Sequence, residues 1–156
     1  MKILFLCTAN SCRSILSEAL FNHLAPASVR AYSAGSEPKG FVHPLTLEAL
    51  GRAGVACDGL FSKPIEAHAE LQPDVVITVC DKAAGEACPV FFGPALRAHW
   101  GLEDPSEVSG SHAESAAAFD ATVGRIKSRI QAFLALPFDQ LNADTLKTEL
   151  TRIGSL

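Results

Sequence analysis

Two hydrophobic periodicities alternate along the first 80 residues, and this alternation constrains the fold more than any other feature. A nearly continuous apolar run over residues 2–7 is typical of a strand buried on both faces, whereas residues 14–26 repeat their apolar positions at helical spacing. The same order returns with a strand pattern at 29–33, a helical pattern at 44–54 and a β-branched run at 74–80. The alternation predicts a parallel sheet with right-handed crossovers and helices on both faces, which is a three-layer α/β domain.

Further elements are expected after the first two helices. Residues 55–60 are compatible with a short strand, and residues 97–100 with a last strand. Ser111 followed by Glu114 matches a capping box at the start of a long amphipathic helix that ends before Pro137. The remaining tail has apolar residues at helical spacing, so we expect a final short helix packed on the body of the domain.

Composition and charge limit the classes of function. With 156 residues, nearly half of them hydrophobic, the chain is long enough for one domain with its own core. The net charge is -4 and no run of Lys and Arg is present, which argues against nucleic acid as a partner. The apolar start ends after residue 6 and no stretch approaches membrane-spanning length, so we expect a cytoplasmic protein without a membrane partner.

The chain contains five cysteines, Cys7, Cys12, Cys57, Cys80 and Cys88. An odd number in a reducing compartment favours reactive or buried thiols over a disulfide framework. The cysteines and histidines lack the gap of about two to four residues that marks a structural zinc site. The sequence therefore points to thiol chemistry and not to zinc.

The connection between the first strand and the first helix places Cys7 at a strand end and Arg13 at a helix start. A loop entering a helix directs backbone N–H groups inward, and with the helix dipole it forms a site for a tetrahedral anion. Arg13 can bind two oxygens of such an anion, and the same positive field should lower the pKa of Cys7, so a thiolate nucleophile is expected near neutral pH. Asn10 suits a left-handed position, and Ser14 can donate to the Cys7 sulfur or cap the helix. The expected oxyanion-binding residues are Thr8, Ala9, Asn10, Ser11, Cys12, Arg13 and Ser14.

Two further side chains are expected at the same edge of the sheet. Cys80 ends a predicted strand, as Cys7 does, and the carboxyl ends of parallel strands meet at one edge. Asp104, in a loop stiffened by Pro105, is a candidate general acid for protonating a departing oxygen. The alternative is that Asp104 only begins a turn.

Several short motifs together resemble one known family. They are the loop from Cys7 to Ser14, Ser33-Ala34-Gly35, Cys80, Cys88-Pro89, His99-Trp100-Gly101 and Asp104-Pro105. In order and spacing they resemble, from residue 2 to about residue 135, the arsenate reductases built on the low-molecular-weight tyrosine phosphatase fold. The resemblance implies a four-stranded parallel sheet flanked by helices in a domain of residues 1–135, with residues 136–156 as a helical extension packed on the same domain.

The resemblance also implies a redox mechanism for arsenic detoxification. Cys7 attacks arsenate while Asp104 acts as the general acid, and Cys80 then attacks the Cys7 sulfur and releases arsenite. Cys88 resolves the resulting disulfide by attacking Cys80. Reduction of arsenic(V) to arsenic(III) needs two electrons, so a relay of further thiols separates this reaction from phosphate ester hydrolysis. With Arg13, these residues form the expected catalytic set.

The same resemblance suggests the partners. A Cys80–Cys88 disulfide needs an external dithiol, for which thioredoxin is implied and glutaredoxin stays open. Phosphate and sulfate are expected to compete with arsenate as oxyanions. We expect a monomer without a tightly bound cofactor.

A cation site must also be considered. Some members of the resembled family hold a monovalent cation beside the anion loop with side chains such as those at Asn10, Glu18 and Ser33. Lys63 stands near the place of a further carboxylate, where it would repel the ion and replace its charge. We therefore predict no required metal.

Two other functions fit part of the pattern. A low-molecular-weight protein tyrosine phosphatase would share Cys7, Arg13 and Asp104 and hydrolyse a phosphocysteine intermediate, although Ser106 stands where such phosphatases commonly have a tyrosine. A non-catalytic oxyanion or redox sensor would bind arsenate without turnover. Cys12 either forms a protective disulfide with Cys7 or only packs.

Overall fold

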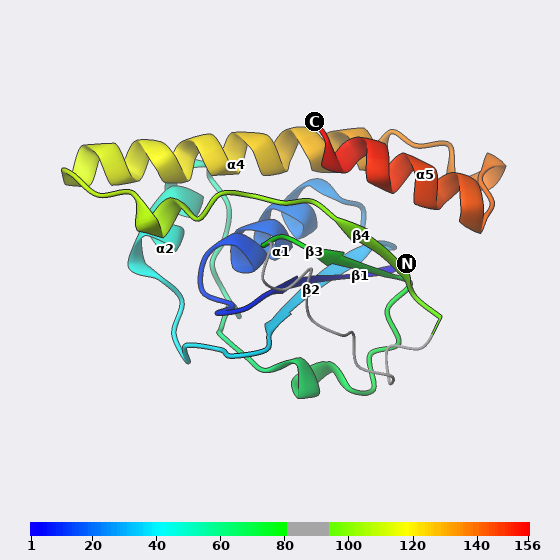
Figure 1. Ribbon diagram of the computed structural model, residues 1–156, viewed down its shortest axis with the longest axis horizontal. Helices are drawn as coiled ribbons and strands as arrows, with labels where there is room; N and C mark the ends of the chain where they lie inside the picture. Colours follow the sequence, from blue (N-terminus) through cyan, green and yellow to red (C-terminus); the bar gives the residue numbers. More distant parts are fainter. Residues whose placement is uncertain (81–93) are drawn as a thin grey trace.

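The computed structural model describes residues 1–80 and 94–156. Its centre is a four-stranded sheet in the order β2-β1-β3-β4, in which every neighbouring pair of strands is parallel (Figure 1). The strands are β1 (Lys2–Cys7), β2 (Arg30–Gly35), β3 (Val75–Thr78) and β4 (Leu96–His99). The predicted four-stranded parallel sheet is confirmed. The strand order reverses beside β1, which is where open α/β sheets bind ligands.

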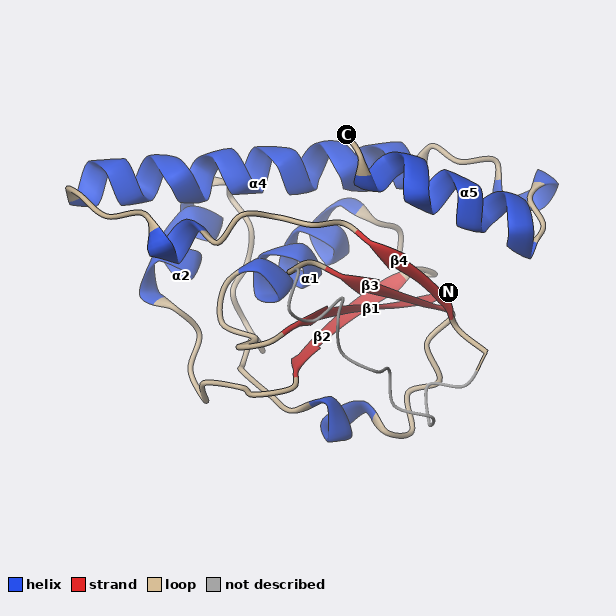
Figure 2. Ribbon diagram, viewed as in Figure 1, coloured by secondary structure: helices blue, strands red, loops and turns tan. Residues whose placement is uncertain are grey.

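The described α-helices pack on one face of the sheet (Figure 2). They are α1 (Arg13–Leu24), α2 (Pro44–Arg52), α4 (His112–Leu134) and α5 (Ala143–Gly154). Helix α1 lies directly against β1 and β2, α4 packs over α1 and α2, and α5 packs against β4. The sequence also predicted helices on the other face, but there the described chain contributes only the short 3-10 helix η1 (Ile65–His68). None of the described helices is both long and apolar enough to cross a membrane.

Strand β1 is held by side chains on both of its faces, because successive strand residues point in opposite directions. Phe5 faces the helices, and its ring lies 6.0 Å from that of Phe21 in α1 and 6.1 Å from that of Trp100. Leu4 and Leu6 face the opposite side, where they join a smaller buried cluster. Burying each of these large side chains contributes roughly 1.5–3 kcal/mol, so the position of the carboxyl end of β1 is strongly determined.

The C-terminal helix α5 is tied to the end of β4. Trp100 Nε1 donates to the carbonyl oxygen of Leu150 at 2.9 Å. Arg129 of α4 is buried, and its guanidinium donates to the carbonyl oxygens of Gly101 at 2.9 Å and Gly154 at 3.0 Å. A Cβ atom at Gly154 would overlap the backbone at the end of β4, so only glycine permits this close approach.

Residues 55–60 are not a strand, contrary to the sequence-based expectation. They form a turn in which the amide of Leu60 donates to the carbonyl oxygen of Cys57, and Gly59 has a φ of +78°. A residue in the left-handed region breaks the extended backbone that a strand requires, so the apolar residues of this segment pack without joining the sheet.

Candidate active site

Cys7 and Cys80 lie together at the carboxyl edge of the sheet. Cys7 is the last residue of β1 and Cys80 follows β3, so the parallel pairing of these strands brings both to one edge, as predicted. Both side chains are buried, and the interaction of the Cys80 side chain with Cys7 raises the pKa of the Cys7 thiol. The hydroxyl oxygen of Thr8 lies 3.6 Å from the Cys80 sulfur. Thiol–disulfide exchange requires such direct access of one sulfur to the other.

The pKa of Cys7 is raised well above its ordinary value, contrary to the low pKa expected from the loop alone. The hydrogen bond with Cys80 is the largest cause, because the Cys7 proton is shared with the neighbouring sulfur, and burial adds to it by disfavouring the charged form. Arg13 and the amide of Thr8 lower the pKa but do not outweigh these effects. A second negative charge on two neighbouring buried sulfurs is strongly unfavourable. The titration of Cys7 is therefore coupled to that of Cys80.

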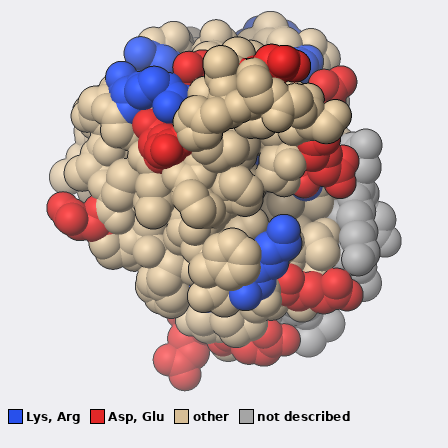
Figure 3. All heavy atoms as spheres, turned by 90° about the vertical axis from the view of Figure 1, so that its left-hand side faces the viewer, with Lys and Arg blue, Asp and Glu red and all other residues tan. Residues whose placement is uncertain are grey.

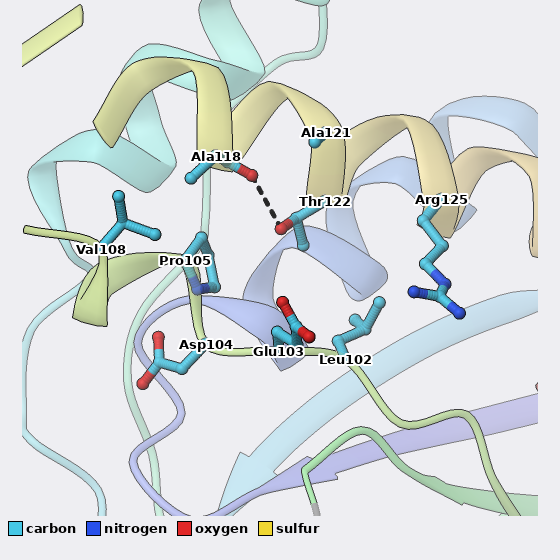
Figure 4. Close-up of a pocket in the computed structure, with 9 residues that line it drawn as sticks. All are labelled: Leu102, Glu103, Asp104, Pro105, Val108, Ala118, Ala121, Thr122 and Arg125. Atoms are coloured by element: carbon cyan, nitrogen blue, oxygen red, sulfur yellow. Dashed lines mark hydrogen bonds between the residues drawn. The ribbon is translucent and has the colours of Figure 1, made fainter. Parts of the chain in front are cut away.

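Arg13 and Asp104 face each other beside the loop of residues 8–12, which we call the anion loop. Nη1 of Arg13 donates to the carbonyl oxygen of Leu102 at 3.0 Å, and its Nη2 lies 3.5 Å from Oδ2 of Asp104. Oδ1 of Asp104 accepts from the backbone N–H of Ser106 at 2.9 Å and from its hydroxyl at 2.6 Å. Figure 4 shows the Asp104 carboxylate pointing away from α4. Asp104 therefore begins the turn of η3 (Pro105–Glu107) and also presents a carboxyl group to Arg13.

Asn10 holds the anion loop from beneath. It is fully buried and has a φ of +47°, in the left-handed region that Asn tolerates, as predicted. Its Nδ2 donates to the hydroxyls of Ser14 at 2.8 Å and Ser33 at 3.0 Å, and its Oδ1 accepts from the backbone N–H of Lys63 at 2.9 Å. Cys12 occupies the N-cap position of α1. Ser14 is therefore not the helix cap, and its hydroxyl pairs with Asn10.

An ion pair between buried Lys63 and partly buried Glu18 lies next to Asn10. The Lys63 side chain is only 5% exposed, and its Nζ lies 3.5 Å from Oε1 of Glu18. It donates to the Ser33 hydroxyl at 3.3 Å and to the carbonyl oxygen of Phe61 at 2.8 Å. Burial lowers the pKa of Lys63, and the Glu18 carboxylate opposes this effect. The residues present do not fit an additional monovalent cation, because the ammonium group already lies among these oxygen atoms.

Gly35 and two hydroxyl groups support the anion loop from its sides. A Cβ atom at Gly35 would overlap carbonyl oxygens at the start of the loop, so glycine is required for this close contact. The hydroxyl of Ser62 donates to the carbonyl oxygen of Ala9 at 3.3 Å, and the hydroxyl of Thr46 donates to the carbonyl oxygen of Ser11 at 3.0 Å. Sequence reasoning missed Ser62 and Thr46, because single hydroxyl residues far from the loop form no motif.

The remaining cysteines have different environments. Cys12 is buried, and burial raises its pKa, whereas Cys57 is half-buried. Cys88, the third member of the predicted relay, lies outside the described residues. Cys7, Cys12 and Cys57 are free thiols, and within the described chain no cluster of three or more His, Cys, Asp or Glu side chains is arranged to hold a metal ion.

The groups at this edge line an open cleft of about 700 Å³, whose walls include Arg13, Lys39, Cys80 and Asp104. A smaller cavity of about 190 Å³ lies between the segment that carries Asp104 and helix α4 (Figure 4). Figure 3 views the molecule from the side at which the strands end, and there Lys and Arg side chains form separate small groups with acidic groups beside them. An anion at this site is therefore attracted by local groups and not by a broad basic surface.

Comparison with known proteins identifies the class of protein that this fold and site define. Residues 2–148 match the family of low molecular weight phosphotyrosine protein phosphatases, and the chain belongs to this family. Within it, the chain is similar to proteins named arsenate reductase. Those of Shouchella clausii and Bacillus subtilis are 34% and 33% identical to it over 131 residues, which is 84% of this chain and 93% of each relative.

Solved structures show the same relationship. An arsenate reductase in the phosphate binding state has a TM-score of 0.70 and 30% identity, and the match covers 86% of this chain and 96% of that one. A thioredoxin-dependent arsenate reductase of Corynebacterium glutamicum has a TM-score of 0.59 and 33% identity, with 83% of this chain and 61% of that chain covered.

Proposed function

We propose that this protein reduces arsenate to arsenite, with Cys7 as the nucleophile and Cys80 as the second thiol. The observation that carries the proposal is that both thiols are buried at the same edge of the sheet beside the anion loop, where the Cys80 side chain raises the pKa of Cys7. Hydrolysis of a covalent intermediate needs only water, whereas a two-electron reduction needs a second sulfur that reaches the first. The relatives named arsenate reductase support the same activity.

The proposed first half-reaction forms and then breaks a sulfur–arsenic bond. The Cys7 thiolate bonds to arsenic, and one arsenate oxygen leaves as water after protonation by Asp104. Cys80 then loses its proton to the arsenic-bound oxygen or to solvent and attacks the Cys7 sulfur. The electron pair of the sulfur–arsenic bond stays on arsenic, so arsenite leaves and a Cys7–Cys80 disulfide remains.

The interaction between the two thiols bears on the order of these events. The Cys80 side chain raises the pKa of Cys7, so the proposed first step requires the proton to stay on Cys80 while Cys7 attacks as the thiolate. Once Cys7 is bonded to arsenic it no longer competes for negative charge, and Cys80 becomes easier to ionise.

The proposed second half-reaction returns the enzyme to its dithiol state. Cys88 attacks Cys80, which frees Cys7 and leaves a Cys80–Cys88 disulfide, and an external dithiol then reduces that disulfide. We propose thioredoxin as this dithiol, in the cytoplasm, because one structural neighbour is thioredoxin-dependent. Glutaredoxin is the alternative donor.

Phosphotyrosine hydrolysis is the second candidate function, because the family description names it. A phosphatase would use Cys7, Arg13 and Asp104 in the same first step, with a phosphorylated cysteine as the intermediate. The position of Cys80 against Cys7 favours reduction, since hydrolysis has no use for a second thiol there.

The test is an NADPH-coupled assay with arsenate, thioredoxin and thioredoxin reductase, run beside a glutaredoxin system and an aryl phosphate substrate. The variants are Cys7→Ser, Cys80→Ser and Cys88→Ser, with Cys57→Ser as the matched control. Arsenate-dependent NADPH oxidation should be abolished in the first three variants and retained in the control. Among these four cysteines, aryl phosphate hydrolysis should depend on Cys7 alone.

Three results would contradict the proposal. Turnover of arsenate by Cys80→Ser at the wild-type rate would refute the proposed thiol relay. Efficient aryl phosphate hydrolysis by the wild-type protein, without arsenate reduction by either donor system, would make the protein a phosphatase. Arsenate binding with neither activity would make it an oxyanion sensor.

A further inference from the structure

The ammonium group of Lys63 lies where oxygen atoms converge from three parts of the chain. Glu18 of α1 contributes a carboxylate oxygen at 3.5 Å, Ser33 of β2 a hydroxyl oxygen at 3.3 Å, and Phe61 a carbonyl oxygen at 2.8 Å. The face of the Phe61 ring, 4.6 Å away, adds a further favourable contact for a cation. One negative charge balances the one positive charge in this set, of which Lys63 and Ser33 are buried.

The distances and the kind of donor define which cation this site suits. Carboxylate, hydroxyl and carbonyl oxygens are ligands for hard cations, but Mg²⁺ binds oxygen at about 2.0–2.1 Å and Ca²⁺ at about 2.3–2.6 Å. The distances from Nζ to Glu18, Ser33 and Phe61 are longer and come with a single carboxylate. The arrangement therefore matches an ammonium group or a large monovalent ion and not a divalent one.

We propose that the Lys63 ammonium group is a cation built into the chain, which takes the place of a separate monovalent ion and positions the anion loop. It acts through Ser33, whose hydroxyl donates to Glu18 at 2.5 Å and accepts from both Lys63 and Asn10. The Ser33 hydroxyl has one hydrogen, which points to Glu18, and two lone pairs, one of which accepts from Lys63. The second lone pair is therefore directed to the amide of Asn10. Lys63 is thus a positioning residue for the loop.

The backbone of Lys63 adds a second connection to the same loop. Its N–H donates to Oδ1 of Asn10, and its carbonyl oxygen accepts from the amide of Gly35, which packs against the loop. The side chain and the backbone of one residue therefore hold Asn10 from two directions. Loss of the ammonium group would leave the partly buried Glu18 carboxylate without its ion-pair partner, which is unfavourable.

The test compares three substitutions at Lys63 in potassium chloride and in choline chloride at equal ionic strength. Lys63→Ala leaves room for an ion, Lys63→Met fills the space without charge, and Lys63→Gln keeps a donor without charge. Lys127→Ala, on the exposed face of α4, is the matched control. The readouts are the thermal midpoint, the affinity for inorganic phosphate and the rate of arsenate reduction.

In choline chloride all three Lys63 variants should lose phosphate affinity and arsenate reduction by roughly 10–100-fold, the usual loss when a supporting group around a site is removed. Potassium chloride should restore much of the loss in Lys63→Ala, little in Lys63→Met, and should leave the wild type and Lys127→Ala unchanged. The thermal midpoint of each variant should respond to potassium chloride in the same way.

Three outcomes overturn the proposal. They are a wild type that depends on potassium as Lys63→Ala does, a Lys63→Ala variant that responds equally to both salts, and a Lys63→Gln variant that equals the wild type in choline chloride. The last outcome decides the matter even when Lys63→Ala does not fold. Only the arsenate readout rests on the proposed function, so a wild type that binds phosphate but does not reduce arsenate refutes that function and leaves the salt test intact.

Discussion

Substitution of Asn10 by alanine removes three hydrogen bonds from a fully buried position beneath the anion loop. At about 0.5–1.5 kcal/mol for each bond, the free energy of unfolding should fall by roughly 1.5–4.5 kcal/mol. The left-handed backbone, with a φ of +47°, adds about 1 kcal/mol, because alanine has no side-chain polar group to compensate the strain. Urea denaturation measures the total change in the free energy of unfolding, and titration with phosphate measures the anion affinity of the loop.

Asn10→Gly separates the two contributions, since glycine loses the same hydrogen bonds but adopts a positive φ without strain. The expected order of stability is wild type, Asn10→Gly, then Asn10→Ala, with about 1 kcal/mol between the last two. Asn142→Ala is the matched control, because it removes the N-cap of α5, costs roughly 0.5–2 kcal/mol and should leave phosphate affinity unchanged. An Asn10→Ala variant within about 0.5 kcal/mol of the wild type would refute the role of the three bonds.

Other perturbations test the thiol pair, the glycine contact and the acid. Cys80→Ala should lower the pKa of Cys7, because the hydrogen-bonding interaction with Cys80 is the largest cause that raises it. The pH midpoint for alkylation of the Cys7 peptide by iodoacetamide should therefore shift to lower pH, and an unchanged midpoint would contradict this. Gly35→Ala should weaken phosphate binding, because the new Cβ atom overlaps the loop. Gly124→Ala in α4 meets nothing within 4 Å and should raise the free energy of unfolding by roughly 0.5–1 kcal/mol. Equal effects of the two substitutions on phosphate binding would argue against the Gly35 contact. Asp104→Asn should slow arsenate reduction by roughly 10²–10⁴-fold, and a wild-type rate would leave Asp104 as a turn residue only.

Local patterns were sufficient to predict much of the fold. The apolar run of β1, the spacing of α1 and the cap at Ser111 each depend on neighbours within a few residues, and each is present as predicted. The pattern at 55–60 was misleading, because a strand needs a partner and an extended backbone, and the left-handed Gly59 prevents the second. Periodicity reports which residues are buried, but it does not distinguish a strand from a turn that packs on the core.

The sequence by itself determined that Cys7 and Cys80 lie at the carboxyl ends of parallel strands, although β3 ends two residues before Cys80, and that a loop able to hold an anion follows Cys7. Only the tertiary structure showed that Cys80 raises the pKa of Cys7 and that the Lys63 ammonium group lies beneath the loop. A pKa depends on the few atoms that touch a sulfur, and Cys80 reaches Cys7 only because β3 pairs with β1. Lys63 likewise meets Glu18 only after the chain has folded, so its role is carried by distances in space and not by spacing along the chain.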